Sequence, residues 1–219
     1  MTSWLWVALL WSASPSSSPP LVDVLTLEPR LRLDIRYATD DNFFGRQVYP
    51  EGRCLLRPIA ARQLLRAQAW LDRRHPGTVL LLKDCYRPHA IQHVLWDAVK
   101  NTPQRRYVAS PHGKIGSIHS YGLAVDLTLW REGGEVDMGT AYDHLGRAAE
   151  PRHEKALLET GQLKAAQIEN RRILRSAMRT AGFTGIGREW WHFNAVPRKK
   201  VTARYPRLDV PLSAVPSPP

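Results

Sequence analysis

An imidazole and a carboxylate lie seven residues apart in the stretch Ser117–Asp126, with a glycine between them. His119 and Asp126 could share one metal ion only if the chain reversed between them. Seven residues of helix would separate the two side chains by about 10 Å, and a straight strand would point them to opposite faces. A turn at Gly122 would supply the reversal and leave Asp126 on the following strand. The pair therefore predicts a metal site built on a turn and a strand.

A catalytic zinc site uses three protein ligands and leaves one position for water. His192, in the stretch Glu189–Phe193, is the best candidate for the third ligand, and Glu189 could serve as the base acting on that water. Because Glu189 and His192 are three residues apart, a regular strand would point them to opposite faces, so a bend, a bulge or a strand that begins after Glu189 is required. The alternative is a structural hydrogen bond between His119 and Asp126, with Glu189 in an ordinary salt bridge.

Five separated segments fall in one order along the chain and resemble a known family. Three are the motifs D-x-Y-R-P at Asp84–Pro88, S-x-H-x2-G-x-A-x-D at Ser117–Asp126 and E-W-W-H at Glu189–His192. The others are Asp34–Phe43 and Asp137–Asp143. Together they resemble the zinc D-alanyl-D-alanine dipeptidases of the VanX type, over most of the chain.

The resemblance implies a role for each candidate site residue. One zinc ion would be held by three ligands: His119, Asp126 and His192. Glu189 would be the catalytic base, and Arg87 would stabilise the oxyanion of the tetrahedral intermediate. Asp143 would bind the free amino group of a dipeptide, with Ser117 close to it. Tyr142 departs from the pattern, since the resemblance leads us to expect phenylalanine there.

The activity implied is hydrolysis of the dipeptide D-Ala-D-Ala to two D-alanines, in cell-wall dipeptide turnover or in glycopeptide resistance. A carboxylate facing the α-amine of the substrate would reject longer peptides, because an internal peptide nitrogen carries no charge. Two alternatives remain. The chain could be a D,D- or L,D-carboxypeptidase acting on peptidoglycan stem peptides, or a non-catalytic zinc-binding domain of the hedgehog type. The complete set of base, arginine and ligands favours an enzyme.

The hydrophobic pattern predicts a single α+β domain over residues 21–198, with a small central antiparallel sheet flanked by helices. Helices are expected from Pro58 to about residue 74, over residues 89–100 and over 163–181. One or two short strands are expected between Leu21 and Tyr37, and further strands at 78–82, from Asp126 through Leu129 and at 189–194. The resemblance implies the same zinc D-Ala-D-Ala peptidase fold, shared with the hedgehog domain. The basic, Pro-rich tail of residues 199–219 lacks a core pattern, so we expect it to be poorly ordered.

The formal net charge of +11 does not predict a nucleic-acid partner, because the basic residues are scattered and do not alternate with aromatic residues. Residues 1–20 read as a signal peptide and linker. Their apolar run Trp4–Trp11 is too short for a bilayer, so stable membrane insertion is not expected, but it suits an export signal. We therefore expect a periplasmic or extracellular protein, the alternative being a cytoplasmic one with a disordered N-terminal tail. The sequence does not predict the oligomeric state.

The chain has two cysteines, Cys54 and Cys85. Neither their spacing nor a neighbouring histidine predicts a thiolate metal site. In an oxidising compartment they could form a disulfide that closes a loop of about thirty residues, which would contribute about 3 kcal/mol to stability. The alternative is a pair of buried thiols, and the sequence leaves this choice open.

Overall fold

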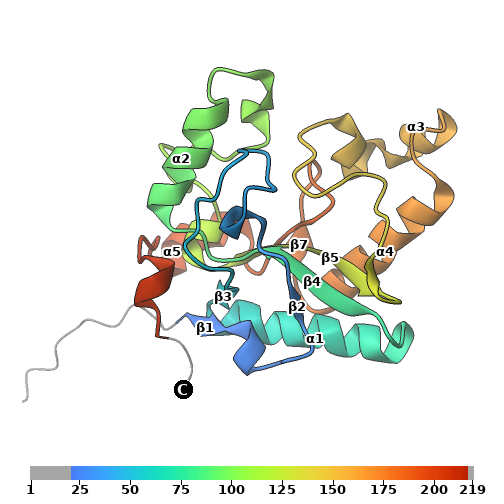
Figure 1. Ribbon diagram of the computed structural model, residues 1–219, viewed down its shortest axis with the longest axis horizontal. Coiled ribbons are helices and arrows are strands. Elements are labelled where there is room, and N and C mark those ends of the chain that lie inside the picture. Colours follow the sequence, from blue (N-terminus) through green and yellow to red (C-terminus); the bar gives the residue numbers. More distant parts are fainter. Residues whose placement is uncertain (1–20, 217–219) are drawn as a thin grey trace, which may run out of the picture.

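Two hydrophobic strands form the centre of the main sheet in the computed structural model, which describes residues 21–216 (Figure 1). They are β4 (Val79–Asp84) and β5 (Ala124–Arg131), which pair in antiparallel orientation with Asp84 opposite Asp126. Every residue of β4 after the first is buried, as is expected of a strand covered on both faces. The export signal expected over residues 1–20 lies outside the described residues.

The strands of the main sheet are arranged in the order β2-β4-β5-β8-β7, and β6 pairs with the last residues of β5. The outer strands are short: β2 (Arg32–Leu33), β6 (Gly134–Glu135), β7 (Thr184–Gly185) and β8 (His192–Asn194). All pairs are antiparallel except β2 with β4, which is parallel. The predicted α+β class is therefore confirmed. The parallel pairing of β2 with β4 departs from the antiparallel sheet that was expected.

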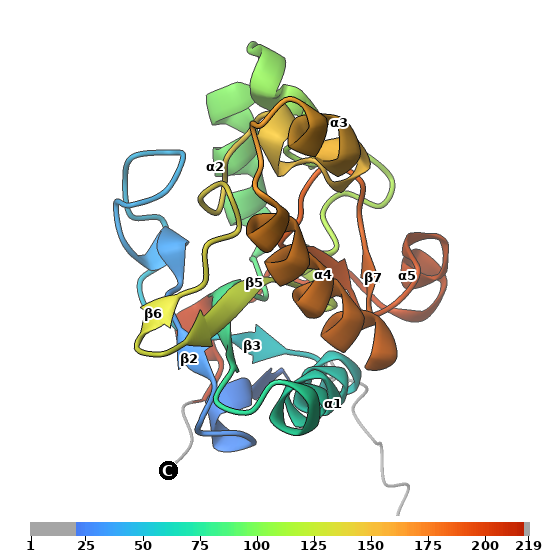
Figure 2. The same cartoon turned by 90° about the vertical axis from the view of Figure 1, so that its right-hand side faces the viewer.

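The three expected helices are present as α1 (Pro58–Arg74), α2 (His89–Val99) and α4 (Ala165–Thr180). Proline is well tolerated at the first position of α1, because the N–H group that it lacks would have no hydrogen-bond acceptor within the helix. α1 and α4 pack against each other, and they also contact β4 and β5 respectively. In Figures 1 and 2, α1 lies below the sheet and α2 above it. None of the helices within residues 21–216 has the length and hydrophobicity needed to cross a lipid bilayer.

A further short helix, α3 (Glu154–Glu159), was not predicted. It lies in the polar segment that precedes α4, and only Glu154 and Leu157 in it are buried. Six residues with two buried side chains give no helical period that a sequence pattern could reveal.

The C-terminal segment contradicts the expectation of a poorly ordered tail. It forms α5 (Arg198–Arg204), and three of its apolar side chains are buried: Val201, Leu208 and Leu212. Buried side chains of the domain donate to its carbonyl groups, since Arg57 Nη2 lies 3.0 Å from the oxygen of Pro206 and Tyr86 Oη lies 2.9 Å from that of Val210. Single apolar residues between prolines thus hold this segment against the domain. They follow no helical or strand period, so the sequence pattern did not indicate them.

A second sheet pairs β1 (Val22–Asp23) with β3 (Leu55–Leu56). Cys54 directly precedes β3 and Cys85 directly follows β4, and these two residues form a disulfide. Both are buried. Of the two alternatives that the sequence left open, the structure has the disulfide, and it links the small sheet to the main one.

Candidate active site

Strand pairing brings two of the predicted metal ligands together. Asp126 on β5 lies directly opposite His192 on β8, in the same row of the sheet as Asp84 on β4. Directly opposed residues on neighbouring antiparallel strands project to one face, with Cβ atoms about 4.5–5.5 Å apart. The sheet itself therefore places the carboxylate beside the imidazole, although the two residues are 66 positions apart in sequence.

His119 joins them through a reversal of the chain. His119–Tyr121 forms a 3-10 turn, and Gly122 follows it with a φ of 65°, in the left-handed region. A Cβ atom at this position would lie 2.7 Å from Cδ2 of Leu21 and 3.3 Å from the backbone nitrogen of Arg57. Glycine is favoured here both by the backbone conformation and by the close approach of these neighbours.

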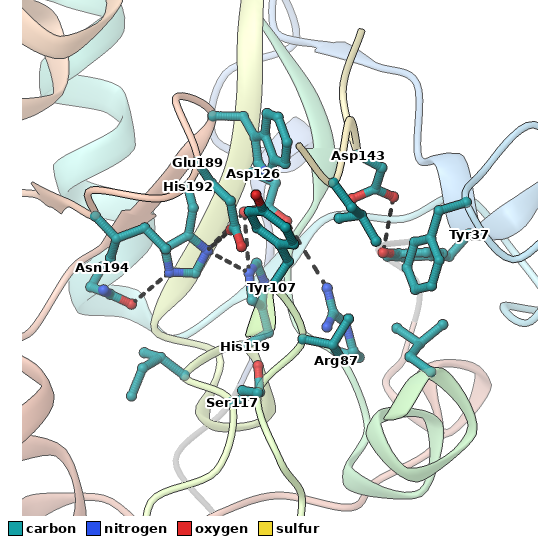
Figure 3. A pocket seen from close by; sticks show the side chains of 18 of the residues that line it. Tyr37, Arg87, Tyr107, Ser117, His119, Asp126, Asp143, Glu189, His192 and Asn194 are labelled. Carbon is teal, nitrogen blue, oxygen red and sulfur yellow. Dashed lines mark hydrogen bonds and ion pairs between the residues drawn. The ribbon is translucent and has the colours of Figure 1, made fainter. Parts of the chain in front are cut away.

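The three side chains converge at one point (Figure 3). Nε2 of His119 lies 3.1 Å from Nδ1 of His192 and 3.3 Å from Oδ1 of Asp126, and the last two atoms are 2.9 Å apart. A tetrahedral ion with bonds of about 2.0–2.1 Å would have ligand atoms about 3.3 Å apart, so the donor set fits one small ion. Among residues 21–216, His119, Asp126 and His192 are the group of side chains that could hold a metal ion, with their donor atoms all within 4.8 Å of one another.

Each ligand also has a partner on the side away from the other two. The contacts are His119 Nδ1 with the carbonyl oxygen of Cys85 at 2.7 Å, His192 Nε2 with Oδ1 of Asn194 at 3.0 Å, and Oη of Tyr142 with Oδ2 of Asp126 at 3.1 Å. An acceptor on the outer nitrogen of an imidazole keeps its proton there and leaves the inner nitrogen free to bind a metal. Both histidines are oriented in this way.

Electrostatics hold the same group together. Burial alone would lower the pKa of His119, but the carboxylates of Asp126 and Asp84 outweigh it and raise this pKa. Burial would likewise raise the pKa of Asp126, but His119 and His192 outweigh it and hold this pKa well below its ordinary value. The environment of Asp126 thus favours positive charge beside it, which a divalent cation supplies.

Glu189 lies beside this cluster and outside any regular strand. Because β8 begins at His192, the opposite-face problem of a continuous strand does not arise. Oε2 of Glu189 is 4.0 Å from Nδ1 of His192. Burial raises the pKa of Glu189 to about 8, with the charge of His192 opposing the shift and that of Asp126 adding to it. A carboxyl group with a pKa near neutral pH suits proton transfer.

The guanidinium of Arg87 is fixed at the edge of the cluster. Its Nε donates to Oδ2 of Asp84 at 3.0 Å, and its Nη1 donates to Oε1 of Gln92 at 2.8 Å. Its Nη2 lies 4.0 Å from Oδ2 of Asp126, and its Cζ lies 5.1 Å from the ring centre of Tyr37. Arg87 is therefore in a buried ion pair with Asp84 and also faces the pocket as a permanent cation.

Asp143 lies on one side of the cluster together with Tyr37, and Asn194 lies on the opposite side (Figure 3). Oη of Tyr37 donates to Oδ2 of Asp143 at 3.0 Å. Burial raises the pKa of Asp143 to about 8, and the neighbouring Asp126 adds to the shift. The φ of Asp143 is 59°, a left-handed conformation that is uncommon outside glycine. Ser117, also buried, lines the same pocket.

The cavity that these residues enclose measures about 140 Å³. Sites for drug-sized ligands measure about 300–1,000 Å³, so this pocket suits a much smaller molecule. All seven residues predicted from the sequence are in its wall: Arg87, Ser117, His119, Asp126, Asp143, Glu189 and His192. His89 and His93 lie on α2 with their Nε2 atoms 3.3 Å apart and take no part in the cluster.

Three residues of the site were not identified from the sequence. Asn194 could have been, because a residue two positions after His192 on a strand lies on the same face. Tyr142 was noted only as a departure from the pattern, and its hydroxyl contacts a metal ligand. Tyr37 belongs to a 3-10 turn far away in sequence, and no spacing rule connects it with Asp143.

Comparison with known proteins shows which family the chain belongs to. A family model described as D-ala-D-ala dipeptidase matches residues 17–211. The match and the arrangement of the site define the class of the protein, which is a metallopeptidase. Within that class, the chain belongs to the D-Ala-D-Ala dipeptidase family.

Individual relatives are similar over most of their length. A protein of Escherichia coli named D-alanyl-D-alanine dipeptidase is 36% identical over 194 residues, which cover 88% of this chain and 91% of the relative. A protein of Enterococcus faecium with the same name is 33% identical, covering 74% of this chain and 85% of its own. One from Streptomyces coelicolor, also so named, is 31% identical with the same coverage.

Proposed function

We propose that this protein is a zinc-dependent dipeptidase that hydrolyses D-Ala-D-Ala to two D-alanines. The observation that supports the proposal best is the convergence of two imidazoles and one carboxylate beside a buried glutamate, in a pocket of dipeptide size. Zinc is the ion we propose because two histidines and a carboxylate form a common donor set for catalytic zinc. The names of the relatives support D-Ala-D-Ala as the substrate.

Zinc held by His119, Asp126 and His192 would supply Lewis acidity and lower the pKa of a bound water to about 7. Glu189 is placed to accept the proton of the attacking water and to return it to the departing amine, which is a poor leaving group without it. Arg87 offers a fixed cation for the charge that develops on the carbonyl oxygen, an effect of about 3 kcal/mol for a well-placed donor.

The ends of the substrate are distinguished by Asp143, which we propose binds the free ammonium group with Ser117 nearby. Asp143 and Tyr37 lie to one side of the cluster, so an ammonium held there would leave the peptide bond next to the metal ligands. An internal peptide nitrogen carries no charge that could offset the cost of ionising this buried carboxyl group, whose pKa is raised to about 8. The pocket would therefore favour a dipeptide over a stem peptide.

The direct test is to load the purified protein with zinc and to assay D-Ala-D-Ala, L-Ala-L-Ala and a stem pentapeptide ending in D-Ala-D-Ala. Free D-alanine released from the D-dipeptide, with little from the other two, is the expected result. Equal release from the pentapeptide would identify a carboxypeptidase instead. A protein that binds no zinc, or that cleaves none of the three, would contradict the proposal.

Replacing the proposed base gives an independent check. Glu189→Gln removes the proton acceptor while keeping the shape of the side chain, so we expect kcat to fall by about 10²–10⁴-fold. Bound zinc should remain at one ion per chain by elemental analysis, because Glu189 is not a proposed ligand. Glu159→Gln, at an exposed position of α3, is the matched control and should leave both quantities unchanged. Full activity in Glu189→Gln would assign the proton transfer to another group.

We also propose that the protein is exported and acts in turnover of cell-wall dipeptides. The apolar run in residues 1–20 supports export, as does the disulfide, since such bonds persist in oxidising compartments. N-terminal sequencing of the mature protein from fractionated cells tests this. A cleaved chain outside the cytoplasm is expected, whereas an uncleaved cytoplasmic chain would favour a role in glycopeptide resistance.

A further inference from the structure

The residue that orients one metal ligand is also half of the disulfide. Nδ1 of His119 donates to the backbone carbonyl of Cys85 at 2.7 Å, and this leaves Nε2 facing His192 and Asp126. The sulfur of the same Cys85 is bonded to Cys54. Cys85 therefore contacts His119 through its backbone carbonyl and is cross-linked to Cys54 through its side chain.

The backbone of Cys85 lies where the sheet gives it little support. β4 ends at Asp84, and its pairing with β5 is irregular between Leu82 and Asp84. The amide of Cys85 donates to the side chain of the adjacent Asp84 at 2.9 Å, a local contact that does not tie the segment to another element. Cys85 itself is therefore not part of a regular ladder.

Two contacts attach Cys85 and its neighbour Tyr86 to a distant part of the chain, at and beside strand β3 of the small sheet. The disulfide joins Cys85 to Cys54, 31 residues earlier, and the next residue, Tyr86, donates its amide to the carbonyl of Leu55 in β3 at 3.0 Å. Cys54 and Leu55 are completely buried, so this attachment point is part of the core. The cross-link and this hydrogen bond act together with a third contact, in which the amide of Arg87 donates to the carbonyl of His119 at 3.3 Å, to set the position of the Cys85 carbonyl.

We propose that the Cys54–Cys85 disulfide is a positioning element of the metal site, which holds the Cys85 carbonyl against His119 and thereby increases the affinity for the metal. The proposal rests on the metal site of the proposed function but not on its substrate. Partners of metal-bound histidines typically change metal affinity by about 10–100-fold when they are altered. Loss of the cross-link should weaken the carbonyl contact, not abolish it, so we expect a change near the lower end of this range.

The test removes the cross-link and keeps the carbonyl, which belongs to the backbone. In the double variant Cys54→Ala with Cys85→Ala, zinc affinity is measured by competition with a chromophoric chelator, and the visible spectrum is recorded after loading with Co²⁺. We expect about tenfold weaker zinc binding and a shifted Co²⁺ spectrum, since this spectrum reports ligand geometry. A folded double variant with unchanged affinity and spectrum would overturn the proposal.

A general loss of stability must be separated from loss of positioning. Leu71→Ala is the matched control, because Leu71 is completely buried near the end of α1 and its truncation leaves the disulfide intact. Both proteins are studied well below their melting temperatures. The control should lose stability but keep the zinc affinity and the Co²⁺ spectrum of the wild type. Equal weakening of zinc binding in the control would also overturn the proposal.

If the double variant does not fold, the wild-type protein provides the measurement. A phosphine reductant converts the folded disulfide to two thiols, with the phosphine taking oxygen from water to become the phosphine oxide. Zinc transfer to the chelator is timed before reduction, after reduction and after reoxidation, with thiols counted at each stage. We expect faster release after reduction and recovery on reoxidation. An unchanged release rate in fully reduced protein would contradict the inference, whereas inactivity towards D-Ala-D-Ala would contradict only the proposed substrate.

Discussion

The hydroxyl group of Tyr142 contacts Asp126, one of the three proposed metal ligands. Its Oη donates to Oδ2 of Asp126 at 3.1 Å, while the other carboxylate oxygen faces the two histidines. The hydrogen bond fixes the rotation of the carboxylate, so that one oxygen is available to an ion and the other is satisfied. This contact has no counterpart when phenylalanine occupies the position.

Tyr142→Phe should therefore weaken zinc binding by about tenfold and leave the pocket shape unchanged. The substitution removes only the hydroxyl, so the packing of the ring against Trp191 should persist. Zinc affinity by chelator competition is the measurement. Tyr107→Phe is the matched control, because its hydroxyl lies in the wall of the same pocket but is bonded to Glu150 and not to a proposed metal ligand, and this variant should bind zinc as tightly as the wild type. Equal affinity in Tyr142→Phe would show that Asp126 needs no such partner.

Asp143 should make the stability of the metal-free protein decrease as the pH rises. Its pKa in the folded protein is raised to about 8 from an ordinary 3.8, chiefly by burial. Between these two values the folded state holds a proton that the unfolded state has lost. The free energy of unfolding therefore decreases as pH rises across this window. Below about pH 4 the group is protonated in both states, so this contribution to stability is fully present.

Asp143→Asn should remove this contribution to the pH dependence. We expect the melting temperature of the metal-free wild type to fall more steeply between pH 5 and pH 8 than that of the variant. Glu189, whose pKa is also raised to about 8, contributes the same trend in both proteins. Because the charge of Asp143 is one of the causes that raise this pKa, the contribution of Glu189 should be smaller in the variant, and both changes flatten its pH profile. Thermal melts in matched buffers provide the measurement. Parallel pH profiles for the two proteins would contradict the assigned environment of Asp143.

Residue types and spacing indicated four of the seven pocket residues, namely His119, Asp126, Glu189 and His192, and the resemblance to a known family added Arg87, Asp143 and Ser117. Neither indicated Tyr37 or the Cys85 carbonyl, for different physical reasons. Tyr37 meets Asp143 across 106 residues of chain, and no local period records such a contact. The carbonyl of Cys85 is a backbone group, so no residue type could reveal that it accepts a hydrogen bond from His119.

At the scale of elements, the site depends on one turn placed against a sheet. Gly122 turns the chain so that His119 faces back towards Asp126 on β5, and β8 brings in His192 from the other side. The strand pairs could be anticipated as hydrophobic runs. Their register could not, because it is set by the packing of both faces of the sheet.

Gly122→Ala should reduce both stability and zinc affinity. An alanine in the left-handed region costs about 1–2 kcal/mol, and its Cβ would also press on Leu21 and the backbone of Arg57. Gly133→Ala is the matched control, because Gly133 has a φ of 81° with open space around it, in the turn before β6. We expect both variants to melt at lower temperature and only Gly122→Ala to bind zinc less tightly, as measured by chelator competition. Unchanged zinc affinity in Gly122→Ala would show that the turn does not set the position of His119.

At the scale of the whole molecule, the C-terminal segment is part of the domain. Fully burying an aliphatic side chain contributes about 1.5–3 kcal/mol, and this segment buries Val201, Leu208 and Leu212. Together these contributions approach the total of about 5–15 kcal/mol by which a domain is stable. No sequence pattern indicated this contribution, because single apolar residues between prolines have no period.

A chain that ends at residue 198 should therefore be unfolded or strongly destabilised. A chain that ends at residue 216 keeps every described contact, including the hydrogen bond from Arg53 Nη1 to the carbonyl of Val215 at 2.8 Å, and should melt like the full-length protein. Circular dichroism melts of the two truncated chains provide the comparison. A stable chain ending at residue 198 would show that the segment packs on the domain without supporting it.

Part of the pocket wall is formed by loops, unlike the strands that carry two of the proposed metal ligands. His192 and Asp126 are on paired strands, whereas Val108, Leu145 and Ile186 line the cavity from irregular loops. Loops tolerate substitution better than the strands they connect. Substituting the three loop residues could therefore change which dipeptides the pocket accepts, for example those with larger D-residues. The residues of the metal cluster would stay the same.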